Sequence, residues 1–319
     1  MTSKLIALVG PTATGKSAIA VELAQRLEAE IVSCDSMQVY KRLPILTQAP
    51  TAEQRTRVLH HLIDCVEPSV NFSAGAYRRM ALPILNDILR RGKRAVIVGG
   101  TGLYLKALVE GLCDAPAVDG VIRQQLWTDC HERGSLALHG RLQAVDAIAA
   151  SRIHPHDAKR IIRAMEIYLA TGTPLSRFWQ QGKTESLKEP VRLFGITRDR
   201  EELYQRINAR LLHMIYEEGV VNEVRRILAE PLSKTARHVH GLRDLERYLG
   251  GTVSLKDTIA VWQQRVRQYA KRQLTWFRRT PRLEWISIPA QEPPAQSAER
   301  LLALLLTMDY GRSSVGDAH

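Results

Sequence analysis

Residues 10–17 read Gly10-Pro11-Thr12-Ala13-Thr14-Gly15-Lys16-Ser17, an octapeptide that matches the phosphate-loop pattern G-x-x-x-x-G-K-[ST]. The apolar run Leu5–Val9 precedes it and predicts a buried strand, while residues 17–27 have helical spacing. A glycine-rich turn between a strand and a helix presents backbone N–H groups and a helix N-terminus to an anion. The octapeptide therefore predicts a site for a diphosphate or polyphosphate, with Lys16 adding positive charge and Ser17 offering a hydroxyl to Mg²⁺.

Strand and helix signals alternate outward from this loop. Residues 30–34 and 94–98 predict two further buried strands, and residues 73–91 predict a helix capped by Ser73. Strands that alternate with helices are typical of a parallel sheet with crossover helices. The sequence therefore predicts an α/β fold, with a P-loop NTPase-like parallel sheet as its core.

The pattern changes near Ala115-Pro116. From about residue 118 to 181 the sequence predicts only helices, interrupted at Gly134, Gly140, Pro155 and Gly172. Strand signals return at 191–197 and 283–288, and a short helix is expected at 298–308. We therefore predict an α/β core formed by 1–115 and 190–290, an inserted all-helical domain formed by 116–189, and a short helix with a flexible tail in 291–319, disordered from 311 onward.

Composition and charge narrow the class of protein. Hydrophobic residues make up 45% of the chain and charged residues 24%, which excludes a largely disordered protein. The apolar runs are far shorter than the roughly 18 residues that a membrane span needs, and the N-terminus lacks a signal-peptide pattern, so we expect a cytoplasmic protein with no membrane partner. The formal net charge of +12 favours an anionic partner, either nucleic acid or a phosphorylated ligand.

The four cysteines predict no metal site. Cys34, Cys65, Cys113 and Cys130 form no C-x-x-C pair and fit no zinc spacing. We expect them to be reduced thiols.

The acidic residue of the site is placed differently from that of ordinary P-loop ATPases, in which an aspartate that holds Mg²⁺ follows an apolar strand. Here residues 95–98 are followed by Gly99-Gly100-Thr101-Gly102, whereas Asp35 follows the strand at 30–34. The carboxyl ends of parallel strands lie at the ligand crevice. We therefore expect Asp35 and Thr101 to face the bound phosphates, the alternative for Asp35 being a turn or cap residue.

Two segments are strongly basic. Residues 259–282 hold seven basic residues and no acidic one, and Trp262, Tyr269 and Trp276 recur within them every seven residues. On a helix these aromatic residues share one face, which predicts that they pack against the core while the cations face solvent or an RNA backbone. The second cluster consists of Lys159, Arg160 and Arg163. It is either a solvated face or, together with the first segment, part of a surface for folded RNA.

Several motifs make the chain resemble a known family. They are residues 10–17, Asp35-Ser36-Met37-Gln38-Val39-Tyr40, His60-His61-Leu62-Ile63-Asp64, Gly99-Gly100-Thr101-Gly102-Leu103-Tyr104, Arg152-Ile153-His154-Pro155, Tyr269-Ala270-Lys271-Arg272-Gln273 and Trp276-Phe277-Arg278. The sequence resembles the tRNA dimethylallyltransferases from about residue 5 to residue 288. The pieces D-S-x-Q-V-Y and G-G-T-G-L-Y in this order are more specific than the phosphate loop.

The resemblance implies a reaction. A dimethylallyl group passes from dimethylallyl diphosphate to N6 of the adenine immediately 3′ of the anticodon, and diphosphate leaves. Asp35 is the implied general base and Thr101 lies near both substrates. Residues 10–17 and Arg210 hold the diphosphate, with Mg²⁺ as the cofactor on Ser17. The partners are the anticodon stem–loop of tRNA, whose adenine must be flipped out, and dimethylallyl diphosphate, and we expect a monomer.

The resemblance also implies a set of residues that contact tRNA. They are Asp35, Ser36, Met37, Gln38, Thr101, Arg123, Lys159, Arg160, Ile161, Ile162, Arg163, His240, Gly241 and Arg243. Gln38 is placed to read the edge of the adenine.

Two stretches depart from the family pattern. Residues 46–50 read Leu46-Thr47-Gln48-Ala49-Pro50 where a lysine is customary, and His240-Gly241-Leu242 lacks a customary tyrosine. Both departures bear on RNA affinity and on the set of tRNAs that is modified.

Three alternatives stay open: a P-loop small-molecule kinase, a prenyltransferase acting on free AMP or ADP, and an RNA-binding module with a vestigial phosphate loop. The basic segments argue against the first two, because a small acceptor needs no such surface. The intact Lys16, Ser17 and Asp35 argue against the third.

Overall fold

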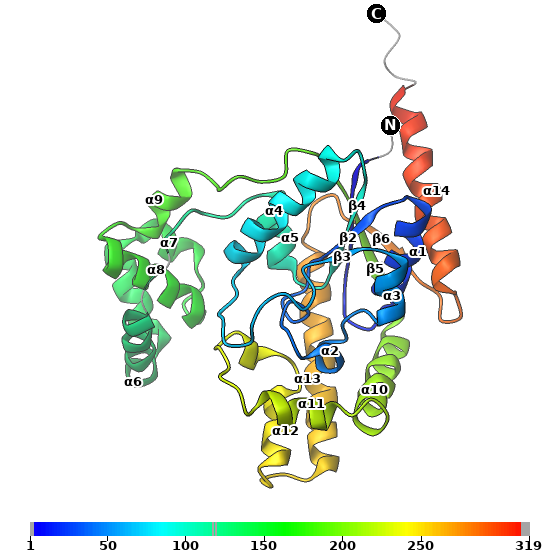
Figure 1. The fold of residues 1–319 in the computed structure, drawn as a ribbon. Coiled ribbons are helices and arrows are strands. Elements are labelled where there is room, and N and C mark those ends of the chain that lie inside the picture. Colours follow the sequence, from blue (N-terminus) through cyan, green and yellow to red (C-terminus); the bar gives the residue numbers. More distant parts are fainter. Residues whose placement is uncertain (1–2, 117, 119, 314–319) are drawn as a thin grey trace, which may run out of the picture. The chain divides into compact units, whose positions relative to one another are not determined.

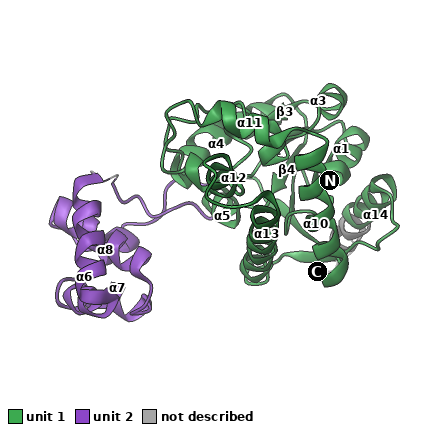
Figure 2. Ribbon diagram, turned by 90° about the horizontal axis from the view of Figure 1, so that it is seen from below, with its two compact units in different colours: residues 1–109, 187–319 green, residues 110–186 purple. Residues whose placement is uncertain are grey.

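The computed structural model describes residues 3–116, 118 and 120–313 (Figure 1). The chain divides into two compact units, one of residues 1–109 and 187–319 and the other of residues 110–186 (Figure 2). These boundaries lie a few residues from those proposed from the sequence, at 116 and 189.

A parallel six-stranded sheet forms the centre of the first unit, in the order β3-β2-β4-β1-β5-β6. Its strands are β1 (Leu5–Val9), β2 (Glu30–Ser33), β3 (His60–His61), β4 (Ala95–Gly99), β5 (Val191–Thr197) and β6 (Glu284–Ser287). The predicted α/β fold class and five of these strands are confirmed. The strand β3 was missed because two residues are too short to show a period.

Both faces of the sheet are covered, which explains the continuous apolar run of β1. Leu5, Ala7 and Val9 belong to one core cluster, and Ile6 and Leu8 belong to the other. The second cluster is closed by α1 (Lys16–Arg26) and α14 (Pro294–Ser313), which lie side by side in Figure 1. The first cluster is closed by α4 (Ala74–Arg90), α5 (Gly102–Val109), α10 (Arg200–Tyr216), α11 (Val220–Ile227), α12 (Leu242–Leu249) and α13 (Leu255–Phe277).

The structure adds two short helices to the predicted elements and extends the predicted C-terminal helix. Two short helices, α2 (Pro44–Thr47) and α3 (Ala52–Arg57), follow β2. The helix α14 runs from Pro294 to Ser313, so residues 311–313 are helical and not disordered as predicted. The prediction for residues 314–319 lies outside the described part of the chain.

The second unit is built from helices around its own core: α6 (Gly120–Val145), α7 (Ala147–Arg152), α8 (Ala158–Thr171) and α9 (Leu175–Gln180). Three predicted breaks are confirmed: Gly134 has φ 79° inside α6, Pro155 lies between α7 and α8, and Gly172 ends α8 with φ 68°. The predicted break at Gly140 is wrong, because a glycine inside a helix costs only about 1 kcal/mol and α6 continues through it.

Two further features concern the cysteines and the lengths of the helices. Cys34, Cys65, Cys113 and Cys130 are all free thiols. Within the described ranges, the helices all fall short of the length and apolarity that a bilayer crossing requires.

Candidate active site

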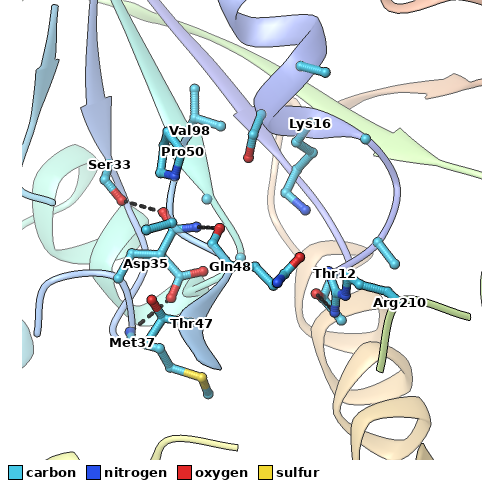
Figure 3. Close-up of a pocket in the computed structure, with 18 of the residues that line it drawn as sticks. Thr12, Lys16, Ser33, Asp35, Met37, Thr47, Gln48, Pro50, Val98 and Arg210 are labelled. Atoms are coloured by element: carbon cyan, nitrogen blue, oxygen red, sulfur yellow. Dashed lines mark hydrogen bonds between the residues drawn. The ribbon is translucent and has the colours of Figure 1, made fainter. Parts of the chain in front are cut away.

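A cavity of about 600 Å³ lies in the first unit, lined by the residues that follow β1, β2 and β4 (Figure 3). The phosphate loop contributes one side through Thr12, Lys16 and Ser17, and Asp35 contributes the other. Arg210 of α10 lies beside Thr12. The expectation that the phosphate loop and Asp35 meet at one crevice is therefore confirmed.

The conformation of the phosphate loop depends on two glycines. Gly10 has φ 140°, and a Cβ there would lie 2.3 Å from the carbonyl oxygen of Ile196 on β5. Gly15 has φ 92° and precedes the first residue of α1. Since L-residues rarely adopt these φ values, only glycine allows β1 to turn into α1 this tightly.

Arginine side chains hold the loop from outside. Arg198 Nε donates to the Thr14 carbonyl at 2.9 Å, and Arg206 Nε donates to the Ala13 carbonyl at 3.0 Å. These bonds fix the loop and bring positive charge close to it. An anion bound in the loop is therefore stabilised before any side chain moves.

Arg210 is the arginine best placed for a ligand. Its Nη2 donates to Thr12 Oγ1 at 3.0 Å, while its buried Nε has no hydrogen-bond partner. Burial, together with the charge of Arg206, lowers the pKa of Arg210 to about 10, so the side chain stays charged at neutral pH. A buried guanidinium N–H without a partner is a donor that an oxyanion can satisfy.

Lys16 is almost closed to solvent, at 8% exposed. Its Nζ donates to the Pro11 carbonyl and, at 3.4 Å, to Thr14 Oγ1. Burial lowers the pKa of Lys16 to about 7, although the charge of Asp35 opposes this shift. The closed site therefore disfavours the charge on Lys16, and a bound anion would favour its charged form.

Asp35 is both a turn residue and a cavity residue. Its Oδ1 accepts a hydrogen bond from the Met37 N–H at 2.9 Å, which holds the carboxylate in a local turn. Burial raises the pKa of Asp35, while the Met37 N–H and the charge of Lys16 lower it, with a net rise. A carboxylate with a raised pKa at the wall of a cavity is suited to accept a proton.

Thr101 binds the turn that carries Asp35. Its Oγ1 accepts from the Ser36 N–H at 2.9 Å and donates to Ser36 Oγ at 3.1 Å. Thr101 is not among the residues that line the cavity. The hydroxyl therefore supports the turn that carries Asp35, and the expectation that Thr101 faces the phosphates stays a prediction.

The glycines at the end of β4 explain why no acid stands there. A Cβ on Gly99 would lie 2.0 Å from the Cys34 carbonyl oxygen, so the backbone leaves no room for a side chain. A Cβ on Gly100 would lie 2.0 Å from Gln273 Nε2 and would displace the Gln273 amide. The carboxylate of the site therefore comes from the end of β2.

Gln273 is a residue of the site that the sequence reasoning left without a role. It is 5% exposed on α13. Its Oε1 accepts from the Thr12 N–H at 2.9 Å, and its Nε2 donates to the Gly100 carbonyl at 3.0 Å. The one available signal was a polar residue on the buried face of a helix.

The residues after Asp35 also line the cavity. Met37 and Gln38 are both in the wall. Gln38 Nε2 donates to the Gln48 carbonyl at 2.8 Å, and Gln38 Oε1 accepts from Ser33 Oγ at 3.2 Å. These bonds leave one amide hydrogen and one oxygen lone pair of Gln38 for a ligand.

The first departure from the family pattern forms part of the same wall. Residues 46–50 all line the cavity, and Gln48 ends α2 with φ 53°. The buried Glu223 accepts from the Leu46 N–H at 2.7 Å and from the Ile45 N–H at 3.0 Å. It thus caps the N-terminus of α2 and holds this wall in place.

The second departure lies at another part of the wall. The His240 ring contacts the Tyr269 ring, with centroids 4.3 Å apart, and both residues line the cavity. Burial, with the charges of Arg272 and Arg265, lowers the pKa of His240 to about 4, so the ring is neutral at pH 7. Gly241 has φ 91° and packs on Trp262, whereas Arg243 is exposed on α12.

The aromatic face of α13 is only partly a core face. Trp262 is 1% exposed and Trp276 is 40% exposed, with Tyr269 half-buried between them. The prediction of core packing is confirmed for Trp262 and wrong for Trp276.

The basic residues of the second unit separate into two groups. Arg123 donates from Nε and Nη2 to the two carboxylate oxygens of Glu166, both at 2.6 Å, and Arg163 donates to Glu166 Oε1 at 2.6 Å. Although burial raises the pKa of Glu166, these two arginines hold it below its ordinary value. The partly exposed Arg123 and Arg163 therefore neutralise a buried carboxylate, a role that the charge pattern does not reveal.

The other tRNA-contact residues expected in the segment 159–163 differ in exposure. Lys159 and Arg160 are exposed at the start of α8, whereas Ile161 and Ile162 are 0% and 2% exposed. The side chains of the two isoleucines face the core of the unit, which corrects the expectation that they contact tRNA.

The side chains that line the cavity limit how a metal ion could be held there. Across residues 3–116, 118 and 120–313, no group of three or more His, Cys, Asp or Glu side chains could hold a metal ion. The Ser17 hydroxyl lines the cavity at the first turn of α1. Mg²⁺ usually takes one or two protein ligands together with phosphate oxygens and water, so a lone hydroxyl beside an anion site fits this metal.

Known proteins match the chain over most of its length. Residues 38–280 match the family model described as IPP transferase. The tRNA dimethylallyltransferase of Geobacter metallireducens is 46% identical over 293 residues, which cover 91% of this chain and 94% of that protein. The tRNA dimethylallyltransferase of Carboxydothermus hydrogenoformans is 40% identical over 309 residues, covering 96% and 97%.

Two solved structures are similar to this one over most of the chain. The tRNA isopentenylpyrophosphate transferase of Bacillus halodurans superposes with a TM-score of 0.69 at 35% identity, covering 98% of this chain and 99% of that one. A eukaryotic dimethylallyltransferase acting on tRNA superposes with a TM-score of 0.80 at 26% identity, covering 98% and 80%.

Proposed function

This chain belongs to the IPP transferase family, and from that premise we propose how its cavity prenylates tRNA. The enzyme is a prenyltransferase that moves a dimethylallyl group from a diphosphate donor to tRNA. The acceptor in our proposal is N6 of the adenine immediately 3′ of the anticodon. The observation that carries the proposal is that Lys16 and Asp35, from different strand ends, line one cavity.

The phosphate loop and Arg210 bind the diphosphate of the donor. The backbone N–H groups of the loop, Lys16 and the unpartnered Nε of Arg210 supply the positive charge. Negative charge grows on the diphosphate as the C1–O bond breaks, and fixed cations stabilise that charge where it develops. These groups therefore favour departure of the diphosphate with its electron pair.

Asp35 acts on the acceptor amine. Its carboxylate accepts a hydrogen bond from the acceptor amine and takes the proton as the N6–C1 bond forms. The raised pKa of Asp35 brings its basicity closer to that of an effective general base. Thr101 is a positioning residue in this scheme, since its hydrogen bonds to Ser36 support the turn that presents the carboxylate.

The adenine must leave its stack to reach this cavity. Gln38 retains one donor and one acceptor with which to bind the edge of the purine. The neutral His240 ring and Tyr269 offer a wall at which RNA is received. The exposed Lys159, Arg160 and Arg243 are proposed to contact tRNA phosphates.

Mg²⁺ is the proposed cofactor. Ser17 would hold it together with oxygens of the diphosphate, where a bound Mg²⁺ supplies additional charge neutralisation. We also propose that the enzyme works as a monomer in the cytoplasm, where its tRNA acceptor is located.

The similar proteins help to decide between the alternative functions. The bacterial relatives named above carry the tRNA activity in their names and cover at least nine-tenths of this chain. This argues against a small-molecule kinase and against a prenyltransferase of free AMP or ADP.

A labelling experiment tests the proposal. The protein is incubated with unmodified tRNA and either dimethylallyl diphosphate carrying radiolabel in its carbon chain or ATP labelled in its γ-phosphate. We expect label from the first donor alone to enter RNA, at the adenine 3′ of the anticodon. Transfer from ATP, or prenylation of free AMP at an equal rate, would contradict it.

A further inference from the structure

One aromatic side chain of the first unit is left open to solvent. Trp276 lies one residue before the end of α13 and is 40% exposed. Tyr269 and Gln273, which precede it on the same helix, line the cavity. The reaction as described above makes no use of Trp276.

The indole of Trp276 packs against the start of α5. A Cβ added to Gly102 would lie 2.1 Å from both Cδ1 and Nε1 of Trp276. Gly102 begins α5 directly after Thr101, which binds Ser36 beside Asp35. The ring therefore packs on the chain next to the loop that supports the general base, and a fixed aromatic ring loses little entropy when it binds a partner.

Basic residues flank the exposed ring in the chain. Arg272 precedes Trp276 by four residues on α13, so it lies on the same side of the helix, with its guanidinium over the Tyr269 ring at 5.8 Å. Arg279 follows Trp276 by three residues, in the turn after the helix ends. Both arginines are exposed. Residues 271–282 contain five basic residues and no acidic one. Charge complementarity therefore points to a polyanion as the partner.

An exposed aromatic ring between cations has the composition of a single-stranded nucleic-acid platform, in which bases stack on rings and cations bind phosphates. Unpaired RNA bases are commonly recognised in this way. When one base of a loop is flipped out, its neighbour loses a stacking partner, and an aromatic side chain can replace it.

We propose that Trp276 stacks against an unpaired base of the tRNA anticodon loop, while Arg272 and Arg279 bind the phosphates on either side. This inference rests on the proposed function, because it takes tRNA as the substrate. It assigns to Trp276 a role in holding the loop open for the reaction and no role in the chemistry.

The test measures binding of a fluorescein-labelled, unmodified anticodon stem–loop by anisotropy at several KCl concentrations. Trp276→Ala should weaken binding about 10-fold or more, the scale of one lost base stack, with an unchanged salt slope. Trp276→Phe should keep most of the affinity. Arg279→Gln should instead lower the slope by about one, since one phosphate contact is lost.

Two controls separate stacking from damage to the fold. Tyr216→Ala removes an aromatic ring that is 67% exposed at the end of α10, and it should leave RNA binding unchanged. Dimethylallyl diphosphate should bind Trp276→Ala as it binds the parent. A 2-aminopurine in the loop should be quenched by the parent and not by Trp276→Ala.

The inference is overturned if Trp276→Ala binds the stem–loop within twofold of the parent, or if Trp276→Phe is as weak as Trp276→Ala. It is also overturned if no loop position distinguishes the parent from Trp276→Ala with 2-aminopurine. Failure of the parent to transfer label to tRNA is a separate result, which removes the proposed function itself.

Discussion

Gln273 accepts a hydrogen bond at 2.9 Å from the backbone N–H of Thr12, a residue 261 positions away in the chain. The same amide donates to the Gly100 carbonyl at 3.0 Å. One side chain of α13 thus joins the phosphate loop to the loop after β4. In the proposed reaction, this connection would help to set the position of the diphosphate relative to Asp35.

Replacing Gln273 should affect catalysis as well as stability. Gln273→Met removes both hydrogen bonds in a closed site, which leaves two backbone groups unpaired and costs about 1–3 kcal/mol of unfolding free energy. We expect kcat/KM for dimethylallyl diphosphate to fall about 10-fold or more, because a displacement of the reactants by about 1 Å is enough for a larger loss. Urea unfolding and steady-state kinetics measure the two effects.

The control is Gln264→Met, which changes an exposed glutamine on the same helix. A loss of stability in Gln273→Met with unchanged kcat/KM would reduce Gln273 to a purely structural residue.

Asp35→Asn should abolish most turnover while substrates still bind. The amide keeps the size of the side chain but cannot accept the N6 proton, so kcat should fall about 100-fold or more. Since the pKa of Asp35 is raised, kcat of the parent should increase as pH rises through that pKa and level off above it. Single-turnover transfer measures both, with the exposed carboxylate variant Asp87→Asn as the control. Parent-like turnover in Asp35→Asn removes the carboxylate from the mechanism.

Lys16 should make donor binding depend on pH. With a pKa of about 7, the free amine is charged below neutrality and loses its proton above it. Affinity for dimethylallyl diphosphate should therefore fall as pH rises from 7 to 9, a range in which the ligand itself has lost its last proton, as phosphate groups do near pH 6. Calorimetry across this range should show a smaller dependence for Lys16→Arg, which stays charged. An equal pH dependence in Lys16→Arg would assign the titration to another group.

The same lysine has a consequence for stability. Its pKa is lower in the folded protein than in the unfolded chain, so the unfolded state binds more protons between about pH 7 and the ordinary lysine pKa of 10.5. The unfolding free energy of the parent should rise with pH over this window. Lys16→Met should show less of this rise, as measured by urea unfolding at several pH values.

In the second unit, Lys159 and Arg160 are the residues with which to test RNA binding. Replacing both with glutamine should lower the salt slope of tRNA binding by up to about two and leave stability unchanged, because both are exposed. Arg123→Gln should differ from this variant by lowering stability, because it deprives the buried Glu166 of two hydrogen bonds. A parent-like slope in the Lys159/Arg160 variant excludes these residues from the RNA surface.

Local features were predictable from the sequence because their physics is local. The run Leu5–Val9 is apolar at every position since both faces of β1 are buried, and the phosphate loop is a contiguous pattern. The position of Asp35 at the cavity followed from the rule that ligands bind at the carboxyl ends of parallel strands.

Features that depend on distant partners were not predictable. The charge pattern around Arg163 cannot show that Glu166 is buried between two arginines. A seven-residue spacing places Trp262 and Trp276 on one face of α13, but it cannot show which part of that face other helices cover. The role of Gln273 can be recognised only from the tertiary structure, which places Thr12 and Gly100 beside it.

The close approach of Gly99 to the Cys34 carbonyl also restricts how this scaffold can evolve. A metal-binding aspartate of the kind that ATP-hydrolysing relatives of the fold carry after this strand cannot be installed at position 99 by one substitution, since the backbone of β2 occupies its space. Acquiring a side chain there would first require the Cys34 backbone, which follows β2, to withdraw from β4. Asp35 is the next residue in the chain, so the same change would also displace the proposed general base.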